Sequence, residues 1–172
     1  DGSSHLIAST VPNCRAWDPT YGYELATIIQ DGTRRMFEAQ EDVFYYITVM
    51  NENYVQPAMP ADIREGILKG MYLLQWKPDA TVQLLGSGTI LRESIAAAEL
   101  LQNDFNIAAN VWSVTSWSEL RRDGMACARH HRLNPAAAPR VSHVEGFLAQ
   151  HAGPVIAASD HGTAVPDLSR AY

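Results

Sequence analysis

An acidic residue and a histidine stand four positions apart at the start of the sequence, in the segment Asp1-Gly2-Ser3-Ser4-His5. The glycine and the two serines favour an irregular backbone, so this segment is predicted to be a loop rather than the start of a helix. A loop that presents a carboxylate and an imidazole can transfer protons and hydrogen-bond the oxygens of a substrate. Asp1 and His5 are therefore the first candidate catalytic residues.

Two glutamates are the next candidates for chemistry. Glu24 lies among apolar residues with helical spacing, and we expect it to be a solvated or salt-bridged residue on a helix surface. Glu52 follows a predicted strand and stands between Asn51 and Asn53. It could act in a site, or it could hold its loop together through hydrogen bonds to the backbone. The sequence leaves both roles open.

Four possible metal ligands lie in the last third of the sequence: Cys127, His130, His131 and His143. Structural zinc sites use regular pairs of Cys and His that close a tetrahedron, and this spacing matches no common pattern. We therefore expect solvated histidines at these positions and assign no metal ligand in the sequence.

The segment Gly86-Ser87-Gly88 stands between a predicted strand and a predicted helix, as a phosphate-binding loop would. The third glycine of the dinucleotide-binding fingerprint is missing, because Leu91 occupies its position. A tight turn between strand and helix is therefore favoured over a nucleotide site.

Composition and charge exclude several classes of protein. The 172 residues are 47% apolar and 19% charged, which is typical of one globular domain or of a small domain with part of another. A net charge of −6 without a basic cluster argues against a nucleic-acid partner. No segment approaches the ~20 consecutive apolar residues of a membrane-spanning helix. The two cysteines, Cys14 and Cys127, indicate a reducing compartment, so a cytoplasmic location is expected.

The first third of the sequence predicts one helix and one strand. Residues 6–16 are predicted to be extended or irregular. Asp18 and Pro19 have the residue types of an N-cap and a first helical position, and apolar residues then recur at helical spacing as far as Glu38. Residues 43–49 are β-branched and aromatic, which is typical of a buried strand. The polar residues 51–54 follow that strand, where α/β proteins usually bind ligands.

A second unit is predicted beyond the proline-rich linker at residues 57–60. Its strands are expected at residues 67–74, 82–85, 111–114 and 155–158. Its helices are expected at residues 90–105, from residue 117 to at least 122, and at residues 144–150, with a loop at 136–139. Strands that alternate with helices at this spacing predict an α/β fold with a doubly wound, mostly parallel sheet.

Three pairs of segments together resemble one protein family: residues 1–5 with 10–14, residues 45–54 with 57–60, and residues 82–92 with 113–120. The most specific of these motifs is Asn51-Glu52-Asn53-Tyr54, followed by Pro57 and Pro60. The chain resembles the homodimeric, bacterial-type pyruvate dehydrogenase, the decarboxylating first component of the 2-oxo acid dehydrogenase complex. The resemblance runs in order from residue 1 to about residue 125 and is weaker afterwards.

The resemblance implies a fragment of a larger, transketolase-like enzyme with three α/β domains. Residues 1–60 would be the C-terminal part of the middle, pyrimidine-binding domain, and residues 61–172 an incomplete C-terminal domain. The parent enzyme would use thiamine diphosphate and Mg²⁺ to decarboxylate pyruvate or a similar short 2-oxo acid. It would pass the acetyl group to a lipoyl domain of the acyltransferase core, as a homodimer in a bacterial cytoplasm.

The resemblance also gives expectations for the site. His5 matches the family's active-site histidine, and Asp1 matches the acid of the related transketolase motif. An imidazole there can hydrogen-bond or protonate the alkoxide that develops on decarboxylation. The family's Gly-Asp-Gly…Asn metal motif and its cofactor-activating glutamate are absent, so no cofactor-binding residue is assigned and the isolated chain is expected to be inactive. We expect His5 to lie near the strand end that carries Asn51 and Glu52.

Two segments depart from the family's pattern. Residues 129–135 read Arg-His-His-Arg-Leu-Asn-Pro where the family has Arg-Trp-Asn-x-Leu-His-Pro, and residues 159–162 read Ser-Asp-His-Gly where it has Thr/Ser-Asp-Tyr-Met. Both are expected to lie away from the reacting centre.

Three alternatives stay open: a paralogue acting on 2-oxobutanoate, a transketolase-type transferase, and a non-catalytic α/β interaction module. Arg15 alone does not make a sugar-phosphate site, so the transferase has little support.

Overall fold

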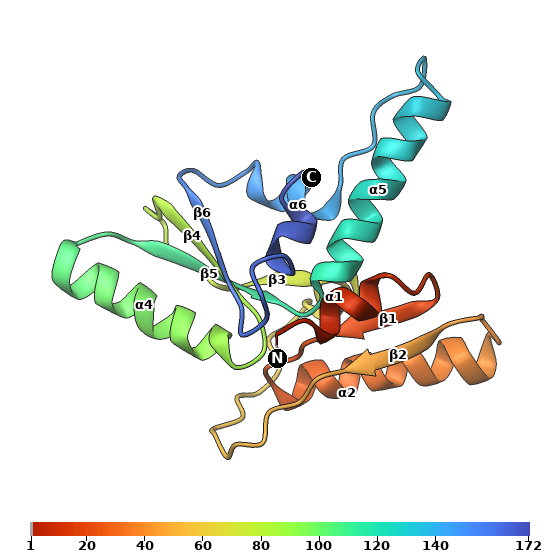
Figure 1. Ribbon diagram of the computed structural model, residues 1–172. Helices are drawn as coiled ribbons and strands as arrows, with labels where there is room; N and C mark the ends of the chain where they lie inside the picture. The colour runs from red at the N-terminus through yellow and green to blue at the C-terminus, as the bar shows by residue number, and fades with distance from the viewer. Residues whose placement is uncertain (1) are drawn as a thin grey trace.

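The structure, a computed structural model, describes residues 2–172 and contains two sheet units (Figure 1). Asp1, one of the two predicted catalytic residues, lies outside the described residues. The first unit is a parallel pair of strands, β1 (Cys14–Trp17) and β2 (Phe44–Ile47). They are joined by helix α2 (Gly22–Thr33), which continues as a π-helix over Arg34–Glu38. The short helix α1 (Ser4–Ser9) packs against β1.

The second unit is a four-stranded sheet with the order β3-β5-β4-β6. Its strands are β3 (Met71–Gln75), β4 (Val82–Gly86), β5 (Ala109–Val114) and β6 (Val155–Ala158). Strand β4 is parallel to β5 and β6, whereas β3 pairs with β5 in the antiparallel direction. The sheet is therefore mostly parallel, as predicted, with one antiparallel edge strand.

Helices cover both faces of this sheet, which confirms the doubly wound arrangement (Figure 1). They are α3 (Arg64–Lys69), α4 (Ile90–Phe105), α5 (Trp117–Leu133), α6 (His143–Leu148) and a final 3₁₀ turn (Pro166–Ser169). All six residues of β5 are buried. Successive side chains of a strand point to opposite faces, so Val111 packs with Leu91 of α4 while Trp112 packs with residues of α6 on the other side.

The two units meet at the C-terminal ends of β1 and β5. The backbone N–H of Asp18, directly after β1, donates to the carbonyl of Thr115, directly after β5, at 2.8 Å. The hydroxyl of Ser116 donates to the carbonyl of Ala16 at 2.5 Å. Loops that leave both sheets therefore converge at one place, the position where α/β folds usually build their sites.

Several local predictions for the first unit are wrong. The loop predicted at residues 1–5 ends early, because Ser4 begins α1 while Gly2 and Ser3 lie outside any helix or strand, and α1 also replaces the extended or irregular backbone predicted at residues 6–9. Asp18 does not cap α2, which begins at Gly22 after the N-cap Tyr21. Strand β2 is only half-buried, since a sheet of two strands cannot cover both of its faces.

In the second unit, the predicted strand at residues 67–74 is divided. Gly70 adopts a φ of 105°, a left-handed conformation that ends α3 and starts β3. The helices and strands predicted from residue 82 onward are confirmed, with ends that differ by a few residues.

Two compositional expectations can also be compared with the structure. Within residues 2–172, no helix combines the length and the apolar character that crossing a membrane requires. Cys14 and Cys127 are both free thiols.

Candidate functional site

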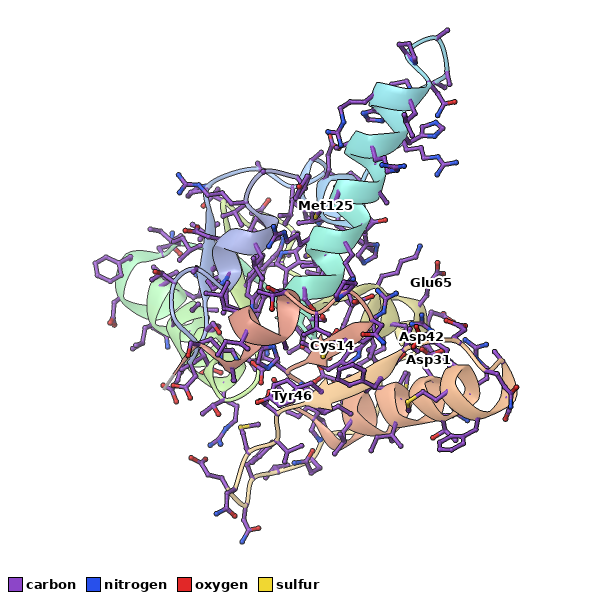
Figure 2. The ribbon with its side chains drawn as sticks, turned by 45° about the vertical axis from the view of Figure 1, so that its right-hand side comes forward. Cys14, Asp31, Asp42, Tyr46, Glu65 and Met125 are labelled. Atoms are coloured by element: carbon purple, nitrogen blue, oxygen red, sulfur yellow. The ribbon has the colours of Figure 1, made fainter. Side chains whose placement is uncertain are left out.

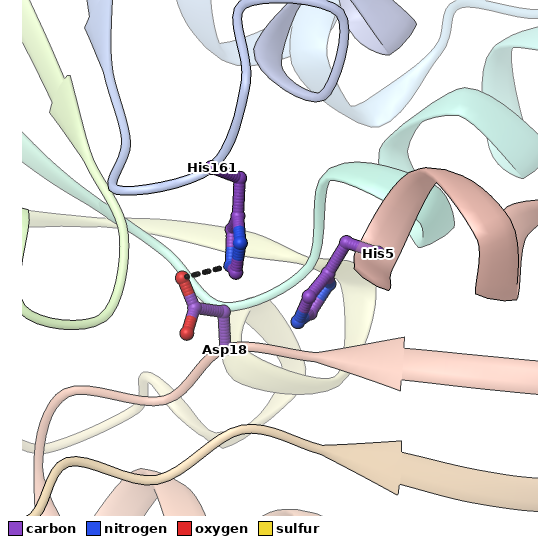
Figure 3. Close-up of side chains that lie close together, drawn as sticks. All are labelled: His5, Asp18 and His161. Atoms are coloured by element: carbon purple, nitrogen blue, oxygen red, sulfur yellow. Dashed lines mark ion pairs between the residues drawn. The ribbon is translucent and has the colours of Figure 1, made fainter. Parts of the chain in front are cut away.

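Two histidines and an aspartate gather where the two sheet units meet (Figure 3). His5 comes from α1, Asp18 from the loop after β1, and His161 from the loop after β6. His5 is 2% exposed and Asp18 is 7% exposed, so both are sheltered from solvent. The segment after β2 also contacts His5, through a hydrogen bond between Nε2 and the hydroxyl of Thr48.

The N-terminal segment and the His161 loop are fastened to each other. The backbone N–H of Gly162 donates to the carbonyl of Gly2 at 2.7 Å. A Cβ atom at Gly2 would fall 2.5 Å from the nitrogen of Gly162, so this approach needs a glycine. The result is that the His5 and His161 rings face each other, with their centroids 4.2 Å apart and their planes tilted by 36°.

Thr48 connects His5 to Asp18. Its hydroxyl donates to Oδ1 of Asp18 at 2.6 Å, and Nε2 of His5 lies 3.0 Å from the same hydroxyl oxygen. A hydroxyl carries one hydrogen. Since that hydrogen goes to the carboxylate, Thr48 accepts from His5, and the proton of the neutral imidazole is on Nε2. Tyr46 of β2 (Figure 2) closes another side of His5, with an edge contact at 5.4 Å between ring centroids.

The turn between β4 and α4 makes room for the aspartate. The backbone N–H of Gly88 donates to the carbonyl of Asp18 at 3.1 Å, and Gly88 has a φ of +50°. A Cβ atom here would lie 2.5 Å from Oδ1 of Asp18. The segment at residues 86–88 is thus the tight turn that the sequence predicts, and its second glycine has a specific role beside the Asp18 carboxylate.

The charge states of the cluster follow from burial and contact. The pKa of His5 is lowered to about 4: burial is the largest cause, the neighbouring His161 acts in the same direction, and Asp18 opposes both. His5 is therefore neutral at pH 7. Burial disfavours the ionised form of Asp18, but contacts with His161, Thr48 and Ser87 outweigh it and lower the pKa of this carboxyl. Asp18 is therefore ionised.

His161 is incompletely satisfied. Its Nε2 lies 3.3 Å from Oδ2 of Asp18, close enough for an ion pair, yet it is buried and the alignment does not make a hydrogen bond. A buried nitrogen without a hydrogen-bond partner is uncommon in folded proteins. The cluster thus has an unused donor or acceptor next to a carboxylate.

The predicted neighbours of His5 are only partly the observed ones. His5 lies at the C-terminal end of β2, as expected, but Thr48 is the residue that contacts it. Asn51 and Glu52 are exposed further along the loop, and Glu52 forms an ion pair with Arg92 at 2.9 Å. Glu52 also lines a pocket of 160 Å³ with Tyr54 and with Thr20 of the loop that follows β1.

Glu24 is not the surface residue that the sequence predicts. It is fully buried, because the apolar spacing of α2 places it against the second sheet. Its carboxylate accepts hydrogen bonds from the backbone N–H groups of Thr20 and Tyr21 and from the hydroxyls of Tyr72 and Ser113, at 2.6–3.0 Å. Burial raises the pKa of Glu24, and the four donors act in the opposite direction.

The four possible zinc ligands of the last third do not come together. His130 and His131 lie at the C-terminal end of α5, where His131 is exposed, and His143 contacts the carbonyl of Met71 at 3.0 Å. Within residues 2–172, one group of three metal-ligating side chains is close enough to share an ion: His5, Asp18 and His161.

Sequence reasoning missed two members of this cluster. Asp18 was interpreted as a helix cap, although its position directly after a strand was a usable signal. His161 was expected to lie away from the candidate catalytic residue His5, but the two rings are in contact, because the loop that carries His161 is hydrogen-bonded to the N-terminal segment. No sequence pattern indicates this contact between the two ends of the chain.

Comparison with known proteins agrees with the fold. Residues 1–57 match the family model of the pyruvate dehydrogenase E1 component middle domain, and residues 70–168 match that of the transketolase-like C-terminal domain. The chain also resembles a transketolase structure from Campylobacter jejuni, with a TM-score of 0.62 and 19% identity over 96% of this chain and 22% of that one. A split-gene transketolase described as an inactive β4 tetramer gives a TM-score of 0.56 at 18% identity, over 99% of this chain and 48% of that one.

Sequence relatives are more similar. The chain is 63% identical over 164 residues to the pyruvate dehydrogenase E1 component of Pseudomonas aeruginosa, which covers 94% of this chain and 19% of the relative. Identity is 47% to the same component of Cupriavidus necator and 45% to that of Escherichia coli K12, over 100% of this chain and 20% of each relative. The chain spans about a fifth of these relatives. It belongs to the transketolase-like family, and it is homologous along its length to pyruvate dehydrogenase E1 components.

Proposed function

We propose that this chain forms part of the active-site wall of a thiamine-diphosphate-dependent pyruvate dehydrogenase E1 component. That enzyme would decarboxylate pyruvate and transfer the acetyl group to a lipoyl domain. The similarity to E1 components from three bacteria supports this reaction. The observation that carries the proposal is the buried, neutral His5 at the meeting point of the strand ends, with its proton held on Nε2.

The two sheet units correspond to parts of two domains in this proposal. Residues 1–60 would belong to the middle, pyrimidine-binding domain and residues 61–172 to the C-terminal domain. The two family matches leave residues 58–69 between them, which supports a boundary near residue 60. Exposed residues occupy most of this segment, as expected of a linker.

The residues of this chain do not make a complete site for thiamine diphosphate and Mg²⁺. The sequence contains no Gly-Asp-Gly segment. The aspartate of the cluster already accepts a hydrogen bond from Thr48 on one carboxylate oxygen and lies beside His161 with the other. Mg²⁺ prefers oxygen ligands in an octahedral arrangement, whereas this cluster offers two imidazoles. The cofactor and its metal would therefore be held mainly by residues outside this chain.

His5 would act as a hydrogen-bond donor to a substrate oxygen. At neutral pH its imidazole is uncharged and carries its proton on Nε2, facing Thr48. In a site that excludes water, such a donor stabilises negative charge that develops on oxygen more strongly than it would in water. The His161 ring covers His5, so the loop at residues 159–162 would move aside when a substrate binds.

A chimeric enzyme tests this function. The segment of the Escherichia coli E1 component that aligns with this chain would be replaced by residues 1–172, and turnover of pyruvate would be measured with its lipoyl acyltransferase partner. A parallel chimera with the Pseudomonas aeruginosa segment controls for the effect of the exchange. Pyruvate-dependent acetyl transfer within about tenfold of the control supports the proposal.

Three outcomes would contradict it, and each favours an alternative named above. A preference for 2-oxobutanoate over pyruvate indicates the paralogue. Ketol transfer between sugar phosphates indicates a transketolase-type transferase. A folded chimera without activity, beside an active control, indicates that the chain serves as an interaction module.

A further inference from the structure

The cluster of His5, Asp18 and His161 has the donor set of a metal site. One nitrogen from each imidazole and one carboxylate oxygen all lie within 4.8 Å of one another. We propose that these three side chains bind a divalent transition-metal ion, with Zn²⁺ the best match to two nitrogens and one oxygen. The site would keep a fourth position for water or another small ligand, as sites with three protein ligands do.

The geometry is close to what Zn²⁺ requires. Zinc binds histidine nitrogens and carboxylate oxygens at about 2.0–2.2 Å, so ligand atoms in a tetrahedron lie about 3.4 Å apart. Nε2 of His161 and Oδ2 of Asp18 are already 3.3 Å apart. The remaining donors lie within 4.8 Å of one another, so they need to approach by up to about 1.4 Å, which side-chain rotations of His5 can supply.

The chemical states of the ligands are also those that a metal requires. A ligand must present a lone pair, so histidine has to be neutral and the carboxyl ionised. His5 is neutral because burial disfavours its charged form, and Asp18 is ionised because its contacts favour the charged form.

An unused buried atom is the independent observation. Nε2 of His161 is buried without a hydrogen-bond partner, although it lies beside a carboxylate. A bound cation between Nε2 and the carboxylate would satisfy this nitrogen through its lone pair. Harder ions fit less well, because Mg²⁺ and Ca²⁺ select oxygen ligands over imidazole.

Residues around the cluster hold the ligands in place. Thr48 fixes one oxygen of Asp18 by a 2.6 Å hydrogen bond and leaves the other oxygen facing His161. Gly88 gives the carboxylate its space, and the bond between Gly162 and Gly2 holds the two histidine segments together. Such outer contacts orient the ligands of metal sites and raise their affinity.

The metal site does not rest on the proposed function. A metal held between His5, Asp18 and His161 would fill the space beside the His5 ring and fix its orientation, so a substrate could not reach the imidazole while the metal is bound. Zn²⁺ would then act as an inhibitor of an E1 enzyme, and it would be a structural ion in a chain without that activity.

The test uses metal alone with the 172-residue chain. Zn²⁺ affinity is measured by competition with a chromophoric chelator, and Co²⁺ is added separately to record its visible absorption. We expect one Zn²⁺ per chain and the intense Co²⁺ bands of a four-coordinate site. His161→Gln and Asp18→Asn should each weaken Zn²⁺ binding at least about tenfold, while His131→Gln, which changes an exposed histidine on α5, should not alter it.

Two results would overturn the proposal. One is equal Zn²⁺ affinity in His161→Gln and His131→Gln, which would assign binding to surface histidines. The other is weak, octahedral Co²⁺ absorption in the wild-type chain. Circular dichroism of each variant separates loss of the site from loss of the fold, and Asp18→Asn, which changes one atom of a buried side chain, serves where His161→Gln does not fold.

Discussion

Two buried carboxylates lie six residues apart, on either side of the loop between β1 and α2, and both reach the second sheet unit. Glu24 accepts four hydrogen bonds, two from backbone N–H groups and two from hydroxyls of β3 and β5. Asp18 has one short hydrogen bond from Thr48 and a neighbouring histidine whose Nε2 has no hydrogen-bond partner. The carboxylate of Glu24 is thus fully hydrogen-bonded, whereas the cluster around Asp18 keeps a polar atom without a hydrogen-bond partner.

This difference distinguishes a structural acid, Glu24, from a candidate functional one, Asp18. A fully hydrogen-bonded carboxylate in a dry interior joins the elements that donate to it and has nothing left to offer a ligand. Glu24 thereby links α2 of the first unit to both β3 and β5 of the second. The Asp18 cluster leaves polar groups unsatisfied, which costs stability and is common at sites of binding or catalysis.

The largest expected effect comes from removing the saturated acid. Glu24→Ala would leave four buried donors without an acceptor, each an unfavourable desolvated group. We expect the free energy of unfolding to fall by about 3–5 kcal/mol. Urea denaturation followed by tryptophan fluorescence measures it. Glu99→Ala, an exposed acid on α4, is the matched control and should change stability by less than about 0.5 kcal/mol.

If Glu24→Ala lowers the free energy of unfolding by less than about 1 kcal/mol, the distinction between the two acids is contradicted. Such a result would mean that the two sheet units are held together without this carboxylate. Glu24→Gln tests the same distinction with a smaller change. The amide keeps one acceptor oxygen but places an NH₂ group against two of the donors, so we expect an intermediate loss of stability.

The next effect is the pH dependence that His5 confers. The pKa of His5 is about 4 in the folded chain and 6.5 when unperturbed. Above pH 6.5 both states are neutral at this residue and the stability is fully present. As the pH falls from 6.5 to 4, the unfolded chain takes up a proton that the folded chain does not. The free energy of unfolding should therefore decrease, by up to about 3 kcal/mol.

Comparison of the wild-type chain with His5→Gln separates the contribution of His5 to the pH dependence from those of other titratable groups. The difference in unfolding free energy between the two proteins should shrink steadily between pH 6.5 and pH 4 in urea titrations. A difference that stays constant across this range would mean that His5 is charged or solvated in the folded chain.

The smallest expected effect concerns Glu52, an exposed acid with which the two buried acids can be compared. Its side chain is 57% exposed and its partner Arg92 is 39% exposed, so solvent screens their ion pair. Glu52→Gln should change the thermal stability by no more than about 0.5 kcal/mol. The same variant decides between the two roles that the sequence leaves open for Glu52. A large loss of activity in the chimera at unchanged stability would assign Glu52 to the site.

The sequence predicts the second unit better than the first. From residue 82 onward, strands and helices have clear periodicity and end at turn-forming residues, so local pattern and tertiary structure agree. In the first unit, tertiary contacts override local preference. Asp18 has the residue type of a helix cap, but its carboxylate is used by Thr48 and His161, and α2 begins at Gly22.

Of the three residues in the candidate cluster, the sequence singled out one, His5, as a candidate for chemistry. His5 follows from its chemistry and from the resemblance of the flanking segment. Asp18 and His161 do not, because their proximity depends on how a loop after β6 meets the start of the chain, and no local pattern encodes a contact between residues so far apart. The same reasoning misplaced Glu24, since helical spacing identifies a buried face but not a polar residue whose partners lie on another sheet.

The most direct test measures kcat for pyruvate in the chimeric enzyme with His5→Gln and with Glu24→Gln, beside the melting temperature of each. If the Asp18 cluster is the functional site and Glu24 the structural one, His5→Gln lowers kcat at least about 100-fold with a melting temperature close to that of the parent. Glu24→Gln should lower the melting temperature and leave kcat of the folded enzyme within about threefold. Unchanged kcat in His5→Gln, in an enzyme that remains folded and active, would contradict the account.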